Sequence, residues 1–368
     1  MYSLVITTKS IALKDVSTLV SWLSQLIATP SLSREEEQTA ALIEGWLQDG
    51  GLSPQRHGNN VWVASPHNQA GLPTVLLNSH HDTVKPNAGY TRDPFAPAVD
   101  DGKLYGLGSN DAGGCLMCLL ATFLHFVEQP LAGVNLVFAA SAEEEISGKG
   151  GMEALFPQLP NIDVAIVGEP TLGQLAVAEK GLMVIDAVAP GRSGHAAREE
   201  GDNALYRALD DIAWLRQFEF PQQSAWLGKV KATATIIQAG SQHNVVPAEC
   251  TFTLDVRTTD ASSNQEVLGI LQKHMHSTLT PRSTRLQPSG IPAEHPLVQA
   301  GLAMGREAYG SPTLSDQALI PVPSLKMGPG DSARSHTADE FIWVHELERG
   351  HQDYVQLLTG FAERLVKP

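Results

Sequence analysis

The sequence Val75-Leu-Leu-Asn-Ser-His-His-Asp82 places three apolar residues before a polar stretch that contains two imidazoles and a carboxylate. The same arrangement, an apolar run followed by polar residues that can act as ligands, recurs three times further along the chain. The runs are Asn135–Ala140 before Glu143-Glu-Glu145, Val164–Val167 before Gly168-Glu169, and Ser324–Met327 before Gly328-Pro-Gly-Asp331, with His336 shortly after. Short apolar runs of this kind are typical of strands that are buried on both faces, as in parallel sheets.

Helical periodicity fills the sequence between and beside these strands. It predicts helices at 15–28, 34–49, about 112–127 and about 294–309. Alternating buried strands and helices indicate an α/β three-layer sandwich with a mostly parallel sheet. Sites in such sheets form outside the carboxyl ends of the strands, so we expect one pocket to collect the imidazoles and carboxylates.

The pattern changes between residues 181 and 287. The sequence predicts strands at 183–188, 233–238, 251–256 and near 285–287, with helices at 202–217 and 263–277. This βαββαβ order is ferredoxin-like. We therefore expect residues 181–287 to form an inserted domain, and residues 1–180 together with 288–368 to form the catalytic domain.

Composition limits the possible functions. The 368 residues are 42% hydrophobic and 18% charged, enough for a sizeable core and about two domains. Twenty-five basic against 40 acidic residues and no basic patch argue against nucleic acid. The apolar runs look shorter than a membrane span of about 20 residues, and Met1–Thr8 lacks a basic, apolar leader. Three cysteines make no disulfide framework, which predicts a cytoplasmic protein, and Cys115 and Cys118 are expected to be buried thiols on one helix.

The residues predicted to meet in one pocket are six carboxylates and two imidazoles. They are His80, Asp82, Asp111, Glu143, Glu144, Glu145, Glu169 and His336. Crowded carboxylates repel one another, and divalent cations relieve that repulsion. Mixed His/Asp/Glu ligation suits catalytic zinc, with cobalt or manganese as substitutes, and the set is large enough for two ions that share a carboxylate. Each motif alone has a plainer explanation, such as a surface pair, a solvated helix start or a helix cap, but their joint occurrence favours a metal site.

Over nearly its whole length the chain resembles the metal-dependent amidohydrolases that include acetylornithine deacetylase, succinyl-diaminopimelate desuccinylase, aminoacylase and carboxypeptidase G. The resemblance is strongest to acetylornithine deacetylase-like enzymes of arginine biosynthesis, including those that act on acetyl- or succinyl-citrulline. The matching segments are Asn78–Val84, Gly106–Gly114, Ser141–Gly148, Val167–Thr171, Gly194-His195, Asn244–Pro247, Asp255-Val-Arg257 and Ser335–Glu340.

The resemblance implies a role for each matching residue. Asp111 would bridge two metal ions, with His80 and Glu169 completing one ligand set and Glu145 and His336 the other. Asp82 would orient His80, and Glu144 would act as general base on the attacking water.

Two alternatives remain open within these motifs. The family usually has Asp-Glu-Glu where this chain has Glu143-Glu-Glu145, so the register can shift by one residue. We keep Glu144 as the base and Glu145 as the ligand because the flanking Ser141 and Ser147 then align without a gap. His81 is a rival ligand to His80, although the His-x-Asp spacing favours His80.

Three residues of the predicted inserted domain complete the site that the resemblance implies. His195 would stabilise the oxyanion, supplied by the partner subunit in dimeric relatives, and the plainer alternative is a surface histidine. Arg257 and Asn244 would hold the α-carboxylate of the substrate, and the alternative for Arg257 is an ordinary strand salt bridge. Lys180, at the junction, is a weaker candidate for specificity.

The sequence thus predicts a dinuclear zinc-dependent amidohydrolase. We expect it to hydrolyse small N-acyl amino acids of the N-acetylornithine or N-acetyl- or succinyl-citrulline type. We also expect a cytoplasmic homodimer that pairs through the inserted domain and binds neither membrane nor nucleic acid. The alternatives are a dipeptidase or carboxypeptidase that uses the same site, and an inactive binding protein on the same scaffold.

Overall fold

The computed structural model describes residues 15–366, so the expected absence of a leader at Met1–Thr8 lies outside the described residues. The chain divides into two compact units, each described here by itself. Among the described residues, unit 1 comprises 15–174, 299–306 and 326–366, and unit 2 comprises 175–298 and 307–325. The narrower limits 181–287 for an inserted domain stay a prediction.

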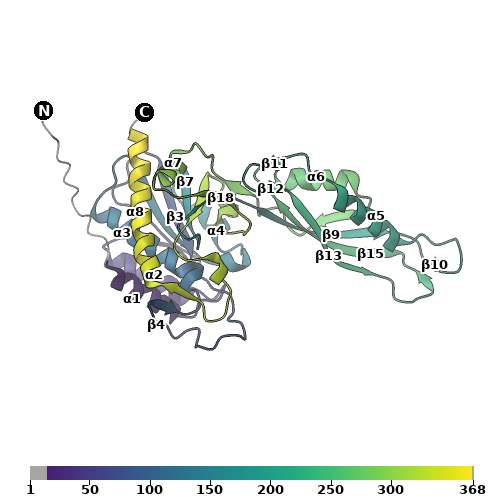
Figure 1. Ribbon diagram of the computed structural model, residues 1–368, viewed down its shortest axis with the longest axis horizontal. Coiled ribbons are helices and arrows are strands. Elements are labelled where there is room, and N and C mark those ends of the chain that lie inside the picture. The colour runs from purple at the N-terminus through teal and green to yellow at the C-terminus, as the bar shows by residue number, and fades with distance from the viewer. Residues whose placement is uncertain (1–14, 367–368) are drawn as a thin grey trace. The chain divides into compact units, whose positions relative to one another are not determined.

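The helices and strands alternate along much of the chain (Figure 1). The α-helices are α1 (Val16–Ile27), α2 (Glu37–Asp49), α3 (Gly114–Glu128), α4 (Met152–Leu155), α5 (Ala204–Gln217), α6 (Asn264–His274), α7 (Pro296–Ala303) and α8 (Val344–Val366). The strands up to the end of unit 1's first segment are β1 (Gln55–His57), β2 (Asn60–Ala64), β3 (Thr74–His80), β4 (Ala98–Asp100), β5 (Lys103–Tyr105), β6 (Asn135–Ser141) and β7 (Val164–Gly168). The later strands are β8 (Leu175–Glu179), β9 (Gly181–Pro190), β10 (Gly194–His195), β11 (Gln223–Ser224), β12 (Gly228–Lys229), β13 (Lys231–Ala239), β14 (Val245–Val246), β15 (Glu249–Thr258), β16 (Thr278–Pro281), β17 (Ser289–Gly290), β18 (Ala308–Ser311), β19 (Ser324–Met327) and β20 (Phe341–Trp343).

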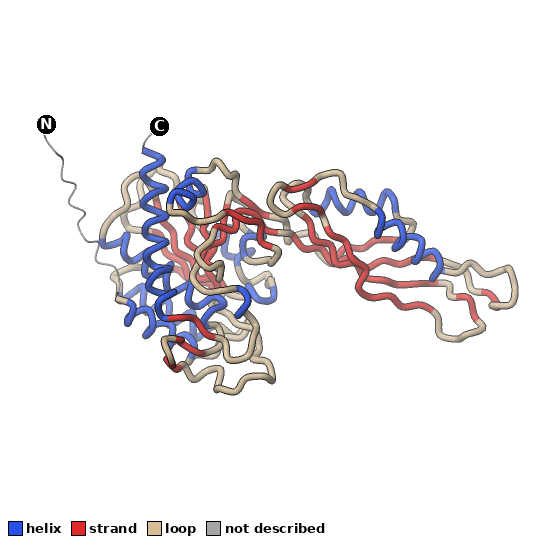
Figure 2. The backbone as a smooth tube through the Cα atoms, in the orientation of Figure 1, coloured by secondary structure: helices blue, strands red, loops and turns tan. Residues whose placement is uncertain are grey.

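The core of unit 1 is a sheet in which β1, β2, β6, β3 and β7 follow one another. Strand β3 runs parallel to both β6 and β7, while β1 and β2 form an antiparallel edge. Every residue of β3, β6 and β7 is buried, and Figure 2 shows helices on either side of these strands. Burial on both faces explains why the strands are apolar throughout rather than alternating, and the α/β class with a mostly parallel sheet is confirmed.

Helix α3 is the central helix of unit 1, and its sequence differs from one expectation. The segment Ser109–Glu128 has the 20-residue length and apolar composition of a membrane span, so the estimate that all apolar runs are shorter was wrong. However, 94% of the segment is buried inside the fold, where it packs on β3, α1 and α8. It is therefore the core helix of a packed domain. Cys115 and Cys118 are buried thiols on α3, as expected, and they donate to the carbonyls of Pro329 and Leu347.

Unit 2 contains an antiparallel sheet in the order β13-β15-β9-β16, with α5 and α6 in the βαββαβ sequence. Residues of β15 alternate between buried and partly exposed, so one face packs on the helices and the other stays open. The last strand is Thr278–Pro281 rather than 285–287, because Leu279 packs into this core while Pro281 can only end an edge strand.

The predicted helix at 294–309 is also corrected, since α7 ends at Ala303. Gly305 has φ +77°, a left-handed conformation that terminates helices, and β18 begins three residues later.

Candidate metal centre

The carboxyl ends of β3, β6 and β7 lie at one edge of the sheet, because the three strands are parallel. His80 is the last residue of β3, Glu144 and Glu145 follow β6, and Glu169 follows β7. Asp111 comes from the π-helical turn Ser109–Gly113 ahead of α3. His336 lies in the loop before β20, with φ +59°. The sheet therefore assembles the predicted cluster from five separate segments.

The cluster consists of two three-residue groups that share Asp111. In the first group, His80 Nε2 lies 3.3 Å from Asp111 Oδ1 and 4.0 Å from Glu169 Oε1. In the second group, His336 Nε2 lies 3.6 Å from Asp111 Oδ2 and 2.9 Å from Glu145 Oε2. Asp111 thus directs one carboxylate oxygen to each group, which is the arrangement that a bridging ligand needs.

The two groups fit divalent cations. Two ligand atoms about 2.0–2.2 Å from one tetrahedral ion lie roughly 3.3 Å apart, close to the measured separations. Each group supplies one imidazole and two carboxylates and no thiolate, which is a donor set for catalytic zinc and for ions such as cobalt or manganese. His80, Asp111 and Glu169 would hold one ion, and Asp111, Glu145 and His336 the other. The identity of the metal stays a prediction.

The electrostatics of the two histidines agree with a cation site. Burial disfavours the charged form of His80, but Glu144, Asp111, Asp82 and Glu169 more than offset that cost and raise its pKa well above the usual value. The hydrogen bond to Glu145, opposed by burial, raises the pKa of His336 to about 9. The carboxylates therefore favour positive charge at both imidazoles, the charge that a metal ion would replace.

Asp82 contacts both His80 and the loop that follows β6. His80 Nδ1 lies 3.0 Å from the main-chain carbonyl oxygen of Asp82 and 3.5 Å from its carboxylate oxygen Oδ1. The carboxylate accepts the backbone N–H groups of Glu144 at 3.0 Å and Glu145 at 3.2 Å, and the hydroxyl of Ser33 at 2.7 Å. Asp82 therefore fixes the loop that carries the proposed base as well as the imidazole.

The three consecutive glutamates point to different partners. Glu143 has φ +56° and its carboxylate accepts the N–H of Gly150, while a Cβ on Gly148 would lie 1.9 Å from Glu143 Oε2. Glu144 Oε2 lies 3.9 Å from His80 Nε2, and Glu145 reaches His336. This geometry supports the register with Glu144 as base and Glu145 as ligand, although both roles stay predictions.

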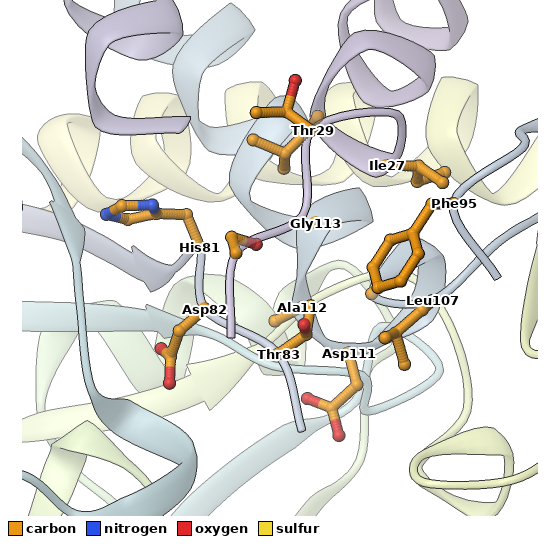
Figure 3. A pocket seen from close by; sticks show the side chains of 13 residues that line it. Ile27, Thr29, His81, Asp82, Thr83, Phe95, Leu107, Asp111, Ala112 and Gly113 are labelled. Atoms are coloured by element: carbon orange, nitrogen blue, oxygen red, sulfur yellow. The ribbon is translucent and has the colours of Figure 1, made fainter. Parts of the chain in front are cut away.

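His81 has both ring nitrogens engaged outside the cluster. Nδ1 lies 2.9 Å from Thr39 Oγ1 and Nε2 lies 3.0 Å from the carbonyl oxygen of Asn59. Figure 3, a view of the pocket beside the cluster, shows the His81 ring and the Asp111 carboxylate pointing in different directions. Burial lowers the pKa of His81, so it is a neutral, hydrogen-bonded core histidine. The structure supports His80 over His81 as the ligand.

Two buried glutamates that organise the site escaped the sequence analysis. Glu36 accepts the N–H of Glu143 and the side-chain amide of Asn59. Glu340 accepts the N–H groups of three residues in the Asp111 turn; burial and the charge of Asp111 raise its pKa to about 8, whereas these three donors lower it. Glu340 is the last residue of the matching segment Ser335–Glu340, so the sequence did mark this residue as a candidate. Its hydrogen-bond donors, however, lie about 230 residues earlier in the chain, and the segment alone does not identify them.

The remaining candidates lie in unit 2, and the structure brings two of them together. His195 on β10 pairs with Val245 on β14, and the N–H of Ala196 donates to the carbonyl of Asn244. Both side chains are exposed, and His195 Nδ1 accepts the N–H of Ala197 at 3.1 Å.

Arg257 lies on β15 of the four-stranded sheet, whereas β10 and β14 form a separate two-stranded sheet. It pairs with Leu182 at the start of β9, whereas the loops carrying His195 and Asn244 adjoin the Pro190–Glu249 pair. The eight residue steps of β15 from Glu249 to Arg257 span about 27 Å, which separates Arg257 from the end of the strand that Asn244 precedes. Arg257 forms a two-point ion pair with Asp255, at 2.8 and 3.1 Å, on the open face of the sheet.

Comparison with known proteins places these observations in a family. Residues 76–360 match the model of peptidase family M20/M25/M40. Acetylornithine deacetylase of Klebsiella pneumoniae is 29% identical and aligns over 92% of this chain and 96% of its own. The Erwinia tasmaniensis protein of the same name is 30% identical over 86% of this chain and 91% of its own.

Solved structures show the same fold at lower identity. Aminopeptidase PepT of Bacillus cereus aligns with a TM-score of 0.75 and 18% identity, over 95% of this chain and 99% of its own. A Bacillus subtilis protein described as a dinuclear metal-binding peptidase of the M20 family aligns with a TM-score of 0.72 and 16% identity, over 95% and 98%.

Proposed function

Because the chain belongs to peptidase family M20/M25/M40 and is a metal-dependent amidohydrolase, we propose that it hydrolyses the amide bond of a small N-acyl amino acid. N-acetylornithine and N-acetyl- or succinyl-citrulline are the first candidates, with a place in arginine biosynthesis in the cytoplasm. The observation that carries the proposal is the sharing of Asp111 between two ligand groups, beside a glutamate that belongs to neither. The relatives named acetylornithine deacetylase support this substrate class.

The residues of unit 1 supply the proton chemistry. Two bound cations would acidify water and polarise the amide carbonyl. Glu144 takes the proton from the attacking water and delivers it to the leaving amine. Asp82 holds Glu144 in place through its backbone N–H, so the base and the ligand Glu145 keep a fixed separation.

The residues of unit 2 would complete the site from two chains. The β10-β14 pair that carries His195 and adjoins Asn244 follows the Pro190–Glu249 end of the four-stranded sheet, and Arg257 lies toward the opposite end, so we infer that a single substrate contacts all three residues when they come from different chains. Strand β13 offers a route to such a homodimer, because it is a sheet edge with Ile236 and Ile237 52% and 44% exposed. Tyr206 and Leu209 on α5 are also exposed. In this proposal the chain whose metal centre binds the substrate supplies Arg257, and the partner chain supplies His195 and Asn244.

A substrate panel on the metal-loaded protein tests the proposal. The panel contains N-acetylornithine, N-acetylcitrulline and N-succinylcitrulline, with unblocked dipeptides of similar size as the comparison. We expect the N-acyl amino acids to be cleaved with the higher kcat/KM, and chelation followed by zinc or cobalt addition to abolish and restore that activity. Faster cleavage of dipeptides would assign the site to a peptidase, and no cleavage at all would support a binding protein.

A further inference from the structure

Glu340 is a buried carboxylate next to the metal centre that the proposed reaction does not use. It is 2% exposed and belongs to the segment Ser335–Glu340, from which only His336 is a proposed ligand. The residue precedes β20, and its main-chain carbonyl accepts the N–H of Gly106, which extends the pairing of β20 with β5 by one step. This pairing places the Glu340 side chain at the turn that carries Asp111.

The carboxylate of Glu340 gathers three backbone donors from that turn. Oε1 accepts the N–H of Asn110 at 2.8 Å and of Asp111 at 2.9 Å, and Oε2 accepts the N–H of Gly108 at 3.1 Å. Both oxygens are therefore engaged by amides, and Glu340 belongs to neither of the two ligand groups. Three N–H groups converge on one anion only if the backbone curls around it, and Gly108 permits this curl with φ +75°.

The turn is also fixed from other directions. The side chain of Asn110 accepts the N–H of Asp331 at 3.0 Å and donates to the carbonyl of the same residue at 3.1 Å. A Cβ on Gly108 would lie 2.6 Å from Thr83 Cγ2, so the turn packs closely on the segment that follows β3. The turn is therefore held by three sets of contacts: the hydrogen bonds of Glu340, those of Asn110, and the close packing against Thr83.

We propose that Glu340 is a positioning residue, whose carboxylate holds the backbone of residues 108–111 so that the two oxygens of Asp111 face the two ligand groups. The proposal rests on the dinuclear site of the proposed function. Asp111 belongs to both groups, so a displacement of its backbone would disturb both ions at once. Groups that orient metal ligands typically change metal affinity or activity about 10- to 100-fold when they are replaced.

The test compares Glu340→Gln with a matched control. The amide keeps the size of the side chain but replaces one acceptor oxygen by an NH₂ group that cannot accept an N–H. Asp353→Asn is the control, since Asp353 on α8 is a buried carboxylate of the same unit and pairs with Arg306. Both variants lose a buried charged interaction and should lower the melting temperature of the metal-free protein.

The readouts are zinc retention in a graded chelator competition and the visible absorption of the cobalt-loaded protein. We expect Glu340→Gln to weaken metal binding about 10- to 100-fold and to change the cobalt spectrum, while Asp353→Asn keeps parental values. Glu340→Asp, which retains both oxygens on a shorter stem, should lie between parent and Glu340→Gln.

Parental metal affinity in Glu340→Gln, or an equal loss in Asp353→Asn, would overturn the positioning role. The result is independent of the substrate assignment. If the parent cleaves no member of the panel yet the two variants differ in metal affinity as described, the proposed function fails and the role of Glu340 stands. A parent that binds no metal would overturn both.

Discussion

The polar residues of unit 1 and those of unit 2 are held in contrasting ways. In unit 1, the side chains of His80 and Glu145 are 1% and 6% exposed, and that of His336, at 55%, is held against Glu145. The loops around them are tied to the buried carboxylates of Asp82, Glu36 and Glu340. In unit 2, His195 and Asn244 are exposed on a two-residue strand pair, and Arg257 is one-third exposed and pairs with a neighbour two residues away. The ligand groups are thus positioned by the fold of one chain, whereas the three unit 2 residues lie in exposed or partly exposed segments and are held by local contacts.

The largest effect should follow from a change inside the ordered cluster. Glu144→Gln removes the base but keeps the loop hydrogen bonds of Asp82, which involve the backbone. Turnover should fall by about 10²- to 10⁴-fold with metal content unchanged. Glu143→Gln is the control, since the Glu143 carboxylate contacts Gly150 rather than the ligands. Normal turnover in Glu144→Gln together with loss in Glu143→Gln would shift the register by one residue.

Removal of His195 should have the next largest effect. His195→Ala should lower turnover by about 10²- to 10³-fold, the usual loss for an oxyanion donor, without altering metal content. If the donor comes from the partner chain, mixing His195→Ala with Glu144→Gln chains should restore activity. Random exchange predicts about a quarter of the parental activity, because half of the dimers are mixed and each mixed dimer has one complete site. Demonstrated mixed dimers without recovery would place His195 in its own chain's site or outside catalysis.

Arg257→Ala should weaken N-acyl amino acid binding by about 2–4 kcal/mol, roughly 30- to 1,000-fold in KM or Ki. The reason is the loss of a guanidinium that pairs with the α-carboxylate of the substrate. The corresponding substrate amide should be a poor substrate for the parent and should respond little to the change. Asp255→Asn is the control, because it frees Arg257 from its ion pair without removing the guanidinium. Equal parental activity on acid and amide would remove the reason for assigning Arg257 this role.

The sequence predicts the parts of the molecule that depend on local pattern. Each of the apolar strands β3, β6 and β7 is followed by polar residues at its carboxyl end. Because parallel strands bring their carboxyl ends to one edge of the sheet, the sequence predicts that His80, Glu145 and Glu169 gather there. The βαββαβ order of unit 2 follows in the same way. The errors occurred where local signals compete. Periodicity placed the last strand of unit 2 near 285–287, but the strand ends at Pro281. Periodicity also extended a helix to 309, but the left-handed Gly305 lies just beyond its end.

The hydrogen bonds that support the ligands could not be predicted. Glu340 and Asp111 are 229 residues apart, and Asp82 and Glu144 are 62 apart, so their contacts exist only once the strands have paired. A buried carboxylate that accepts backbone N–H groups leaves no periodic or compositional trace. The separation of Arg257 from Asn244 was hidden for a similar reason, because it depends on the register of β15 against β9.

The smallest effect concerns the stability of unit 2, where one carboxylate is held as firmly as those of unit 1. Asp211 on α5 is 2% exposed and accepts the N–H groups of His276 and Ser277 and the hydroxyl of Ser277. Burial opposes its charge, but these donors outweigh that cost and lower its pKa.

Because the folded-state pKa lies below the unfolded value of about 3.9, Asp211 stabilises the fold above that pH, and the stabilisation is lost as the pH falls through the folded-state pKa. Asp211→Asn should therefore cost about 1–3 kcal/mol at pH 7, and the difference in unfolding free energy between variant and parent should shrink progressively as the pH falls below about 4. Asp210→Asn, at the exposed neighbouring position, should leave both curves unchanged. An equal loss of stability in Asp211→Asn at pH 7 and pH 3 would show that the lost interaction is packing rather than charge.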